Sequence, residues 1–250
     1  MNLLSVRNLS KSFGGVHAVD RVEFSIVAGE LLAMIGPNGA GKTTCFNLIN
    51  GQLRPDAGAV LFEEKEIQGL APRERCRLGI GRTFQVAATF GSMTVRENVQ
   101  LAVLSSEQKL NSIFSSFAGI SKESAKGILE RVRMGALADR QCAELAYGDL
   151  KRVELAMALA ARPRLLLMDE PTAGMAPAER QGLMNLVREI SRKENLSVLF
   201  TEHDMDVVFG YADRVIVLAE GALIAQGTPA EVRADARVRR VYLGEEAAHA

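Results

Sequence analysis

The most specific chemical signal in the chain is a glycine-rich loop near its N-terminus. Eight consecutive residues fit the pattern GxxxxGK[ST]: Gly36, Pro37, Asn38, Gly39, Ala40, Gly41, Lys42 and Thr43. In such a loop, backbone N–H groups converge on a phosphate, the lysine ammonium reaches the β/γ oxygens, and the hydroxyl is offered to Mg²⁺. An apolar run at 31–35 precedes the loop and a helical pattern at 43–49 follows it. This context favours a binding site for ATP, with Thr44 as a further contact, over a glycine-rich turn without function.

A second element of a phosphate site is a pair of acidic residues after an apolar run. The run occupies 165–168, and Asp169 and Glu170 follow it directly. A buried strand would deliver Asp169 to its carboxyl end, where the carboxylate can hold a Mg²⁺-bound water. Glu170 would point elsewhere and accept a proton from an attacking water. Alone, such a pair is more often a turn or a helix cap, but downstream of a phosphate-binding loop it predicts ATP hydrolysis with Mg²⁺.

These residues need a scaffold of strands and helices to bring them together. Short apolar runs at 31–35, 165–168, 196–201 and 214–218 alternate with helical patterns, which is typical of an α/β fold with a largely parallel sheet. Pro177 precedes one helical pattern and suits a first helical position. The first 30 residues read instead as two strand-like segments around a glycine pair, so we predict a small antiparallel sheet there. Strand signals are absent between about 94 and 161, which predicts an inserted helical block.

Composition narrows the class of protein further. The chain has 250 residues, 48% of them hydrophobic, and its 30 Lys+Arg balance 30 Asp+Glu. This excludes disorder, and the three cysteines, with no CxxC pair, argue against a disulfide framework or a structural zinc site. Net neutrality and the lack of a basic arm argue against a nucleic-acid partner. No apolar run approaches the ~20 residues that span a bilayer, so we expect a cytoplasmic protein.

Three further features resemble the ATP-binding cassette (ABC) family, whose nucleotide-binding subunits hold two ATP molecules at a head-to-tail dimer interface. The first is similar to the family's LSGGQ signature: Leu145, Ala146, Tyr147, Gly148 and Asp149. The resemblance implies that this helix start presents amides to the γ-phosphate bound by the opposite subunit. Asp149 acting simply as an N-cap is the alternative.

The second and third features are single residues in the family's order. Gln85 resembles the glutamine that touches Mg²⁺ and water at the junction of core and helical subdomain. His203 follows the apolar run at 196–200 and resembles the switch histidine that contacts the γ-phosphate. Phe13 is similar to the aromatic residue that stacks on adenine, although a Phe beside a glycine pair could equally belong to a core.

The resemblance implies a complete domain organisation. We expect an α/β P-loop NTPase core with a RecA-like parallel sheet, an N-terminal antiparallel β subdomain and an inserted α-helical subdomain. The whole of 1–250 would be one ABC ATPase domain, with 1–90 and 162–250 as the catalytic core and 91–161 as the helical subdomain that carries the signature. ATP and Mg²⁺ are the implied cofactors, and a second ABC ATPase, identical or related, is the implied partner.

Within the family, several segments resemble ATPase subunits of branched-chain amino acid importers. These segments are RTFQ at 82–85, MTVRENV at 93–99, GTPAEV at 227–232 and YLG at 242–244. The resemblance implies separate transmembrane permease subunits, a periplasmic or extracellular substrate-binding protein that acts indirectly, and a peripheral position on the inner face of the plasma membrane. The alternatives are the ATPase of another ABC system, for lipopolysaccharide or lipid export or urea or amide uptake, and a non-transport ABC nucleotide sensor.

Two positions depart from the family pattern. Ala146 stands where the family has a serine hydroxyl, and Ala176 stands where many members have an aspartate. Either change is expected to weaken closure of the dimer or to make one of two ATP sites inferior. Neither change touches Lys42, Glu170 or His203.

Overall fold

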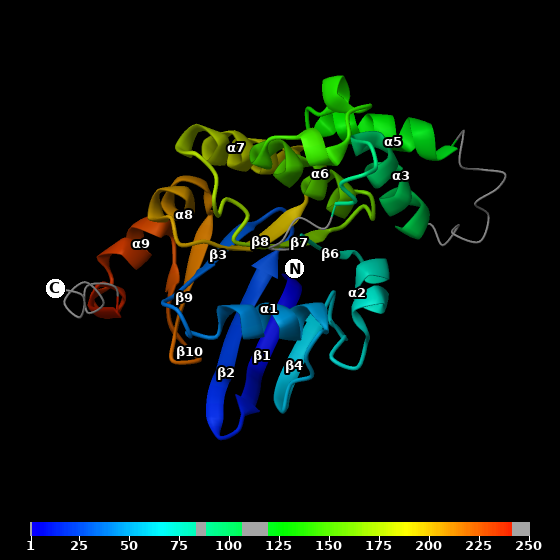
Figure 1. The fold of residues 1–250 in the computed structure, drawn as a ribbon. Helices are drawn as coiled ribbons and strands as arrows, with labels where there is room; N and C mark the ends of the chain where they lie inside the picture. Colours follow the sequence, from blue (N-terminus) through cyan, green and yellow to red (C-terminus); the bar gives the residue numbers. More distant parts are fainter. Residues whose placement is uncertain (1, 84–88, 107–119, 242–250) are drawn as a thin grey trace.

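The computed structural model describes residues 2–83, 89–106 and 120–241, as two sheets with helices around them (Figure 1). The predicted glutamine Gln85 lies outside these residues, so its role stays a prediction. Side chains are described from residue 122 in the last of the three segments.

Four strands from the N-terminal third form an antiparallel sheet in the order β2-β1-β4-β5. Its strands are β1 (Asn2–Phe13), β2 (Val16–Val27), β4 (Ala57–Phe62) and β5 (Lys65–Glu66). Leu4, Val6 and Leu9 are buried on one face of β1. Every second residue of a strand points to the same face, and the register shift between Val6 and Leu9 moves this alternation by one residue. The predicted antiparallel pair is therefore confirmed, and β4 and β5, which the sequence analysis did not predict, extend it.

The second sheet has six strands in the order β10-β9-β3-β8-β7-β6. They are β3 (Leu31–Ile35), β6 (Ile80–Arg82), β7 (Leu165–Asp169), β8 (Ser197–Thr201), β9 (Arg214–Ala219) and β10 (Ala222–Gly227). All neighbours are parallel except the β9–β10 pair. The four predicted strands are β3, β7, β8 and β9, whereas β6 and β10 were not predicted.

Both faces of the parallel sheet are buried, which explains why its strands read as continuous apolar runs. Along β3, the side chains of Leu31, Ala33 and Ile35 belong to one apolar cluster, and those of Leu32 and Met34 belong to another. The first cluster lies between the sheet and most of the helices. The second lies between the sheet and the antiparallel strands. The predicted α/β fold with an antiparallel subdomain is confirmed.

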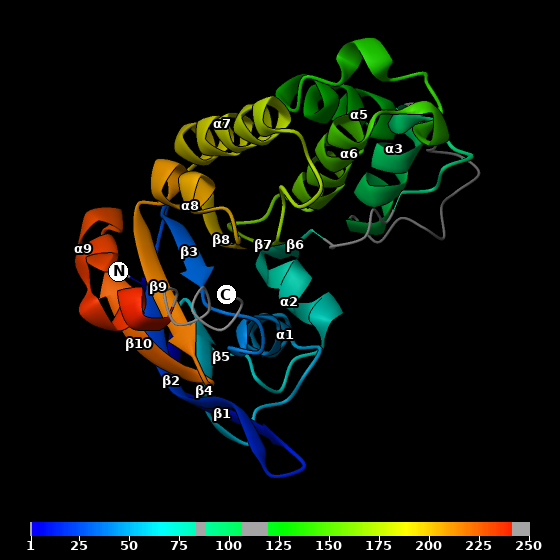
Figure 2. The ribbon, with the colours of Figure 1, turned by 60° about the vertical axis from the view of Figure 1, so that its left-hand side comes forward.

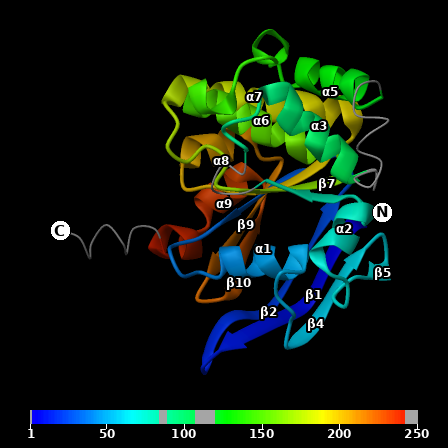
Figure 3. The ribbon, with the colours of Figure 1, turned by 45° about the vertical axis from the view of Figure 1, so that its right-hand side comes forward.

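Helices cover the two faces unequally. The bounds are α1 (Lys42–Asn50), α2 (Pro72–Leu78), α3 (Val95–Ser106), α5 (Ile120–Arg131), α6 (Tyr147–Leu159), α7 (Pro177–Glu194), α8 (Met205–Tyr211) and α9 (Pro229–Ala234). Figures 2 and 3 both show α3, α5, α6 and α7 together on one side of β7, with α1 on the opposite side near the antiparallel strands.

The helical block packs through its own apolar faces. Val99 and Val103 of α3, Leu129 of α5 and Val153 of α6 are buried in one cluster. The described part of 94–161 contains helices, two 3₁₀ turns and one isolated bridge between Thr94 and Gln141. None of the helices in the described segments is long and apolar enough to cross a membrane.

Candidate functional site

The predicted site residues come together because three parallel strands end at one edge of the sheet. β8 lies between β3 and β7, so the carboxyl ends of all three are adjacent. The glycine-rich loop follows β3, Glu170 follows β7, and His203 lies two residues beyond the end of β8. Such an edge is where open parallel α/β sheets bind ligands.

Two glycines fix the path of the phosphate-binding loop. Gly36 has φ 155° and Gly41 has φ 98°, both in a region that L residues rarely adopt. A Cβ added at Gly36 would lie 2.2 Å from the Leu218 carbonyl oxygen, and one at Gly41 would lie 2.2 Å from that of Ala18. Glycine is therefore required by backbone conformation and by close approach, as the motif predicts.

The lysine of the loop is held inside it. Lys42 is the first residue of α1 and is 7% exposed, and its Nζ donates to the carbonyl oxygens of Gly36 at 2.5 Å and Pro37 at 2.9 Å. The ammonium is thus fixed within the loop instead of moving in solvent. Thr43, the next residue, is exposed, so its hydroxyl is open to a ligand.

The first carboxylate of the acidic pair has a partner on each oxygen. Asp169 is 5% exposed at the end of β7. Its Oδ1 accepts a hydrogen bond from Thr201 Oγ1 at 2.7 Å, and its Oδ2 lies 3.3 Å from Arg82 Nη2. These contacts hold the carboxylate in one orientation at the edge of the sheet.

The second carboxylate is directed toward the histidine. Glu170 has φ 48°, which a non-glycine residue rarely adopts, and its backbone N–H donates to Thr201 Oγ1 at 3.0 Å. Its Oε1 lies 2.8 Å from Nε2 of His203, whose side chain is half exposed. Adjacent carboxylates therefore have different partners. The geometry brings together Glu170, predicted from the acidic pair after an apolar run, and His203, predicted from the family resemblance.

The sequence analysis missed a buried glutamate next to the histidine. Glu202 is 4% exposed and accepts hydrogen bonds from the backbone N–H of Thr172 at 2.8 Å and from Thr172 Oγ1 at 2.7 Å. Burial raises the pKa of Glu202, and the hydrogen bonds from Thr172 oppose that shift. Glu202 thus ties the segment after Glu170 to the end of β8. The only feature of the sequence that could have pointed to Glu202 is its position directly before His203.

The signature-like segment forms the start of α6. Ala146 is the N-cap residue and α6 begins at Tyr147, so the alternative that Asp149 is the N-cap is wrong. The backbone N–H of Asp149 donates to the Ala146 carbonyl at 3.0 Å, whereas the N–H groups of Tyr147 and Gly148 have no intrahelical acceptor. Ala146 and Tyr147 are exposed, while a Cβ at Gly148 would lie 2.9 Å from Glu179 Oε1 of α7.

The adenine contact predicted at Phe13 lies on the hairpin that approaches the loop. Phe13 ends β1 and is 47% exposed, with Lys11 Nζ 5.5 Å from its ring centroid. Ala18 of the paired strand β2 closely approaches Gly41 of the phosphate-binding loop. This places the hairpin beside the loop and leaves the ring accessible. Stacking on adenine stays a prediction.

The donor set at the sheet edge fits Mg²⁺. The Thr43 hydroxyl and the Asp169 carboxylate are hard oxygen donors, the kind that this cation prefers. The described residues contain no group of three His, Cys, Asp or Glu that would hold a metal ion unaided. Mg²⁺ is usually bound by one or two carboxylates with substrate phosphates and waters, so a site completed by nucleotide is consistent with these residues.

The phosphate-binding loop follows a central parallel strand, the acidic pair stands at the end of β7, and the histidine follows β8. This combination defines a P-loop ATPase. Residues 19–173 match the ABC transporter family model, and the chain belongs to the family of ABC transporter ATPases. Residues 222–248 match the model described as branched-chain amino acid ATP-binding cassette transporter.

Relatives and solved structures agree with this assignment over nearly the whole chain. The chain is 40% identical to the high-affinity branched-chain amino acid transport ATP-binding protein LivG of Escherichia coli, covering 97% of this chain and 98% of that protein. It resembles the crystal structure of an ATP-binding cassette in its ADP conformation, with TM-score 0.86, 36% identity and coverage of 98% and 99%. A dimeric cassette in a post-hydrolysis state, bound to ADP and Pi, matches with TM-score 0.76 and 25% identity over 90% of this chain and 98% of that one.

Proposed function

We propose that this chain is the ATP-hydrolysing subunit of a membrane importer for branched-chain amino acids. The observation that carries the hydrolytic part is the convergence of the Lys42 loop with the Glu170–His203 pair, 2.8 Å apart, at one sheet edge. The transport specificity is supported by the match of 222–248, a region that includes β10 and α9, and by the name of the Escherichia coli relative.

Each residue at the edge has a distinct proposed role in hydrolysis. The loop amides and Lys42 bind the β/γ phosphates, and Glu170 accepts the proton of the attacking water. His203 orients Glu170 through their hydrogen bond and reaches the γ-phosphate. Thr43 and Asp169, together with Gln85, would hold Mg²⁺, which when bound supplies positive charge against the phosphate oxygens.

Two cassettes are proposed to close on ATP head to tail. A helix N-terminus with amides directed outward is a ready site for an anion, and α6 begins with exposed Ala146 and Tyr147. The dimeric relative with ADP and Pi supports the same assembly. The partner would be a second copy of this chain or a related cassette.

Replacing Ala146 with serine is expected to strengthen this closure. A hydrogen bond to a charged group contributes roughly 1.5–3 kcal/mol, so the added hydroxyl should raise ATP-dependent dimerisation by about ten- to over one hundredfold. We expect a larger dimer fraction for Ala146→Ser in a Glu170→Gln background, measured by sedimentation over a protein concentration series with ATP.

A matched control keeps this test specific to the helix start. Ala143→Ser adds the same hydroxyl at another exposed position, three residues before the N-cap, and should leave dimerisation unchanged. An equal or lower dimer fraction for Ala146→Ser would mean that 145–149 does not face the phosphate of a second copy.

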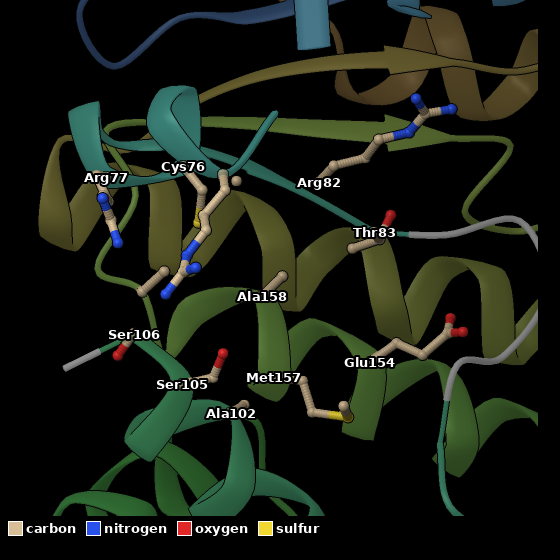
Figure 4. Close-up of a pocket in the computed structure, with 13 residues that line it drawn as sticks. Cys76, Arg77, Arg82, Thr83, Ala102, Ser105, Ser106, Glu154, Met157 and Ala158 are labelled. Carbon is tan, nitrogen blue, oxygen red and sulfur yellow. The ribbon is translucent and has the colours of Figure 1, made fainter. Parts of the chain in front are cut away.

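The proposed membrane partners are separate permease subunits, served indirectly by a periplasmic or extracellular substrate-binding protein. A cavity of about 710 Å³ between α2, α3 and α6 supports a docking place for such a subunit (Figure 4). Its lining mixes basic side chains from α2, such as Arg73 and Arg77, with apolar ones from α6, such as Met157. Bound to such a subunit, the chain would lie at the periphery of the membrane, on its cytoplasmic face.

The function is tested by reconstituting the chain with its co-purifying membrane subunits in vesicles. We expect ATP-dependent uptake of leucine and ATPase activity stimulated by leucine with its binding protein, both reduced at least about 10²-fold by Glu170→Gln. Stimulation by lipopolysaccharide instead of leucine would overturn the importer assignment in favour of an exporter. Hydrolysis that no transported solute stimulates would overturn it in favour of a nucleotide sensor.

A further inference from the structure

Arg82, at the end of β6, contacts two segments that are distant from it in the sequence: the end of α1 and the end of β7. Its Nη1 donates to Asn47 Oδ1 at 2.7 Å and to Gln52 Oε1 at 2.9 Å, and its Nη2 lies 3.3 Å from Asp169 Oδ2. Asn47 belongs to α1, and Gln52 lies two residues beyond its end. Figure 4 shows the guanidinium directed away from Cys76, Arg77 and Met157, which line the same cavity.

The Arg82–Asp169 contact is a mostly buried pair of opposite charges. The two side chains are 11% and 6% exposed. Burial lowers the pKa of Arg82, and the nearby Asp169 carboxylate acts in the opposite direction. The other two acceptors of Arg82 are neutral amide oxygens, which fix the guanidinium without balancing its charge.

Arg82 brings a positive charge to Asp169, which its other partner, Thr201, does not. Thr201 Oγ1 donates to Oδ1 of the carboxylate but carries no charge. A buried carboxylate is costly unless a charge compensates it. A cation at 3.3 Å from Oδ2 also repels any second cation that approaches the same carboxylate.

We propose that Arg82 is a positioning residue that serves as the internal counter-ion of Asp169, orienting the carboxylate and keeping its affinity for Mg²⁺ low until nucleotide phosphates add negative charge. The inference rests on the proposed role of Asp169 at the metal site. Asn47 and Gln52 anchor the guanidinium to the end of the phosphate-binding helix. It therefore stays beside the carboxylate whether or not a metal is present.

The test is the thermal stability of the nucleotide-free protein over a MgCl₂ series at constant ionic strength. Arg82→Met removes the charge and keeps the aliphatic stem, whereas Arg82→Lys keeps the charge. Arg214→Met is the matched control, because Arg214 pairs with buried Glu30 at 2.7 Å and has no role at the proposed metal site. Arg82→Gln, which retains an amide donor for Asn47, gives the same measurement should the Met variant not fold.

Without Mg²⁺, Arg82→Met should unfold on the order of 10 °C below the parent, because one member of a buried pair is lost. Added Mg²⁺ should restore stability, with a half-saturating concentration at least about tenfold below that of the parent, because the competing charge is gone. Arg82→Lys should respond to Mg²⁺ as the parent does. Arg214→Met should lose stability without any gain in its Mg²⁺ response.

An Mg²⁺ response of Arg82→Met or Arg82→Gln equal to or weaker than that of the parent would overturn the counter-ion role. Adding Asp169→Asn to Arg82→Met should abolish the enhanced response, and a response that persists would overturn it too. Binding of a fluorescent ATP analogue to the parent, with and without Mg²⁺, tests the proposed function separately. A parent that binds MgATP, together with Arg82→Met and Arg82→Gln variants that show no enhanced Mg²⁺ response, refutes this inference and leaves the proposed function standing.

Discussion

Glu170→Gln is expected to bind MgATP with parental affinity and to hydrolyse it at least about 10²-fold more slowly, since a general base contributes typically 10²–10⁴-fold. Glutamine keeps the shape of the side chain and removes its basicity. The 2.8 Å contact between Glu170 Oε1 and His203 Nε2 can persist with the amide, so the loss should appear in turnover and leave binding unaffected. Phosphate release under single-turnover conditions and calorimetric ATP binding measure the two separately.

Two comparisons make the Glu170 result specific. Glu23→Gln makes the same chemical change at an exposed position on β2 and should leave turnover unchanged. The slow variant should also accumulate as the ATP-bound dimer in sedimentation. Turnover of Glu170→Gln within about threefold of the parent would show that another group accepts the proton, given the 10²-fold minimum expected of a base.

Lys42→Ala is expected to weaken MgATP binding by about ten- to over one hundredfold, from the roughly 1.5–3 kcal/mol of a hydrogen bond to a charged group. The ammonium is already positioned inside the loop by the carbonyl groups of Gly36 and Pro37, at 2.5 and 2.9 Å. Phosphate therefore meets a cation that needs little reorganisation, and alanine removes it completely. Calorimetric titration with MgATP gives the affinity, and circular dichroism checks the fold.

Lys193→Ala provides the matched control for Lys42. Lys193 is an exposed lysine near the end of α7, paired with Glu189 four residues earlier, and its removal should leave ATP affinity unchanged. A folded Lys42→Ala protein with parental affinity would contradict the assignment of the loop as the phosphate site.

Much of the fold was predictable because the deciding interactions are local. The strand β3, its loop and α1 follow from an apolar run, glycines whose backbone geometry other residues cannot adopt, and helical periodicity. Pro177 begins α7 as predicted, because its fixed φ and missing N–H suit a first helical position. Strands as short as β6, with three residues, carry too few side chains to produce a period and were missed.

The candidate site was likewise predictable from the sequence only in part. The types and spacing of residues predicted Lys42 and the acidic pair, and the family resemblance predicted His203. The sequence did not predict that Thr201 would contact Asp169, 32 residues away, or that Arg82 would reach it across 87 residues. Those contacts exist because β7, which carries Asp169, lies between β8, which carries Thr201, and β6, which carries Arg82. Strand order depends on how helices pack across both faces of the sheet, so only the tertiary structure decides which polar groups face the buried carboxylate.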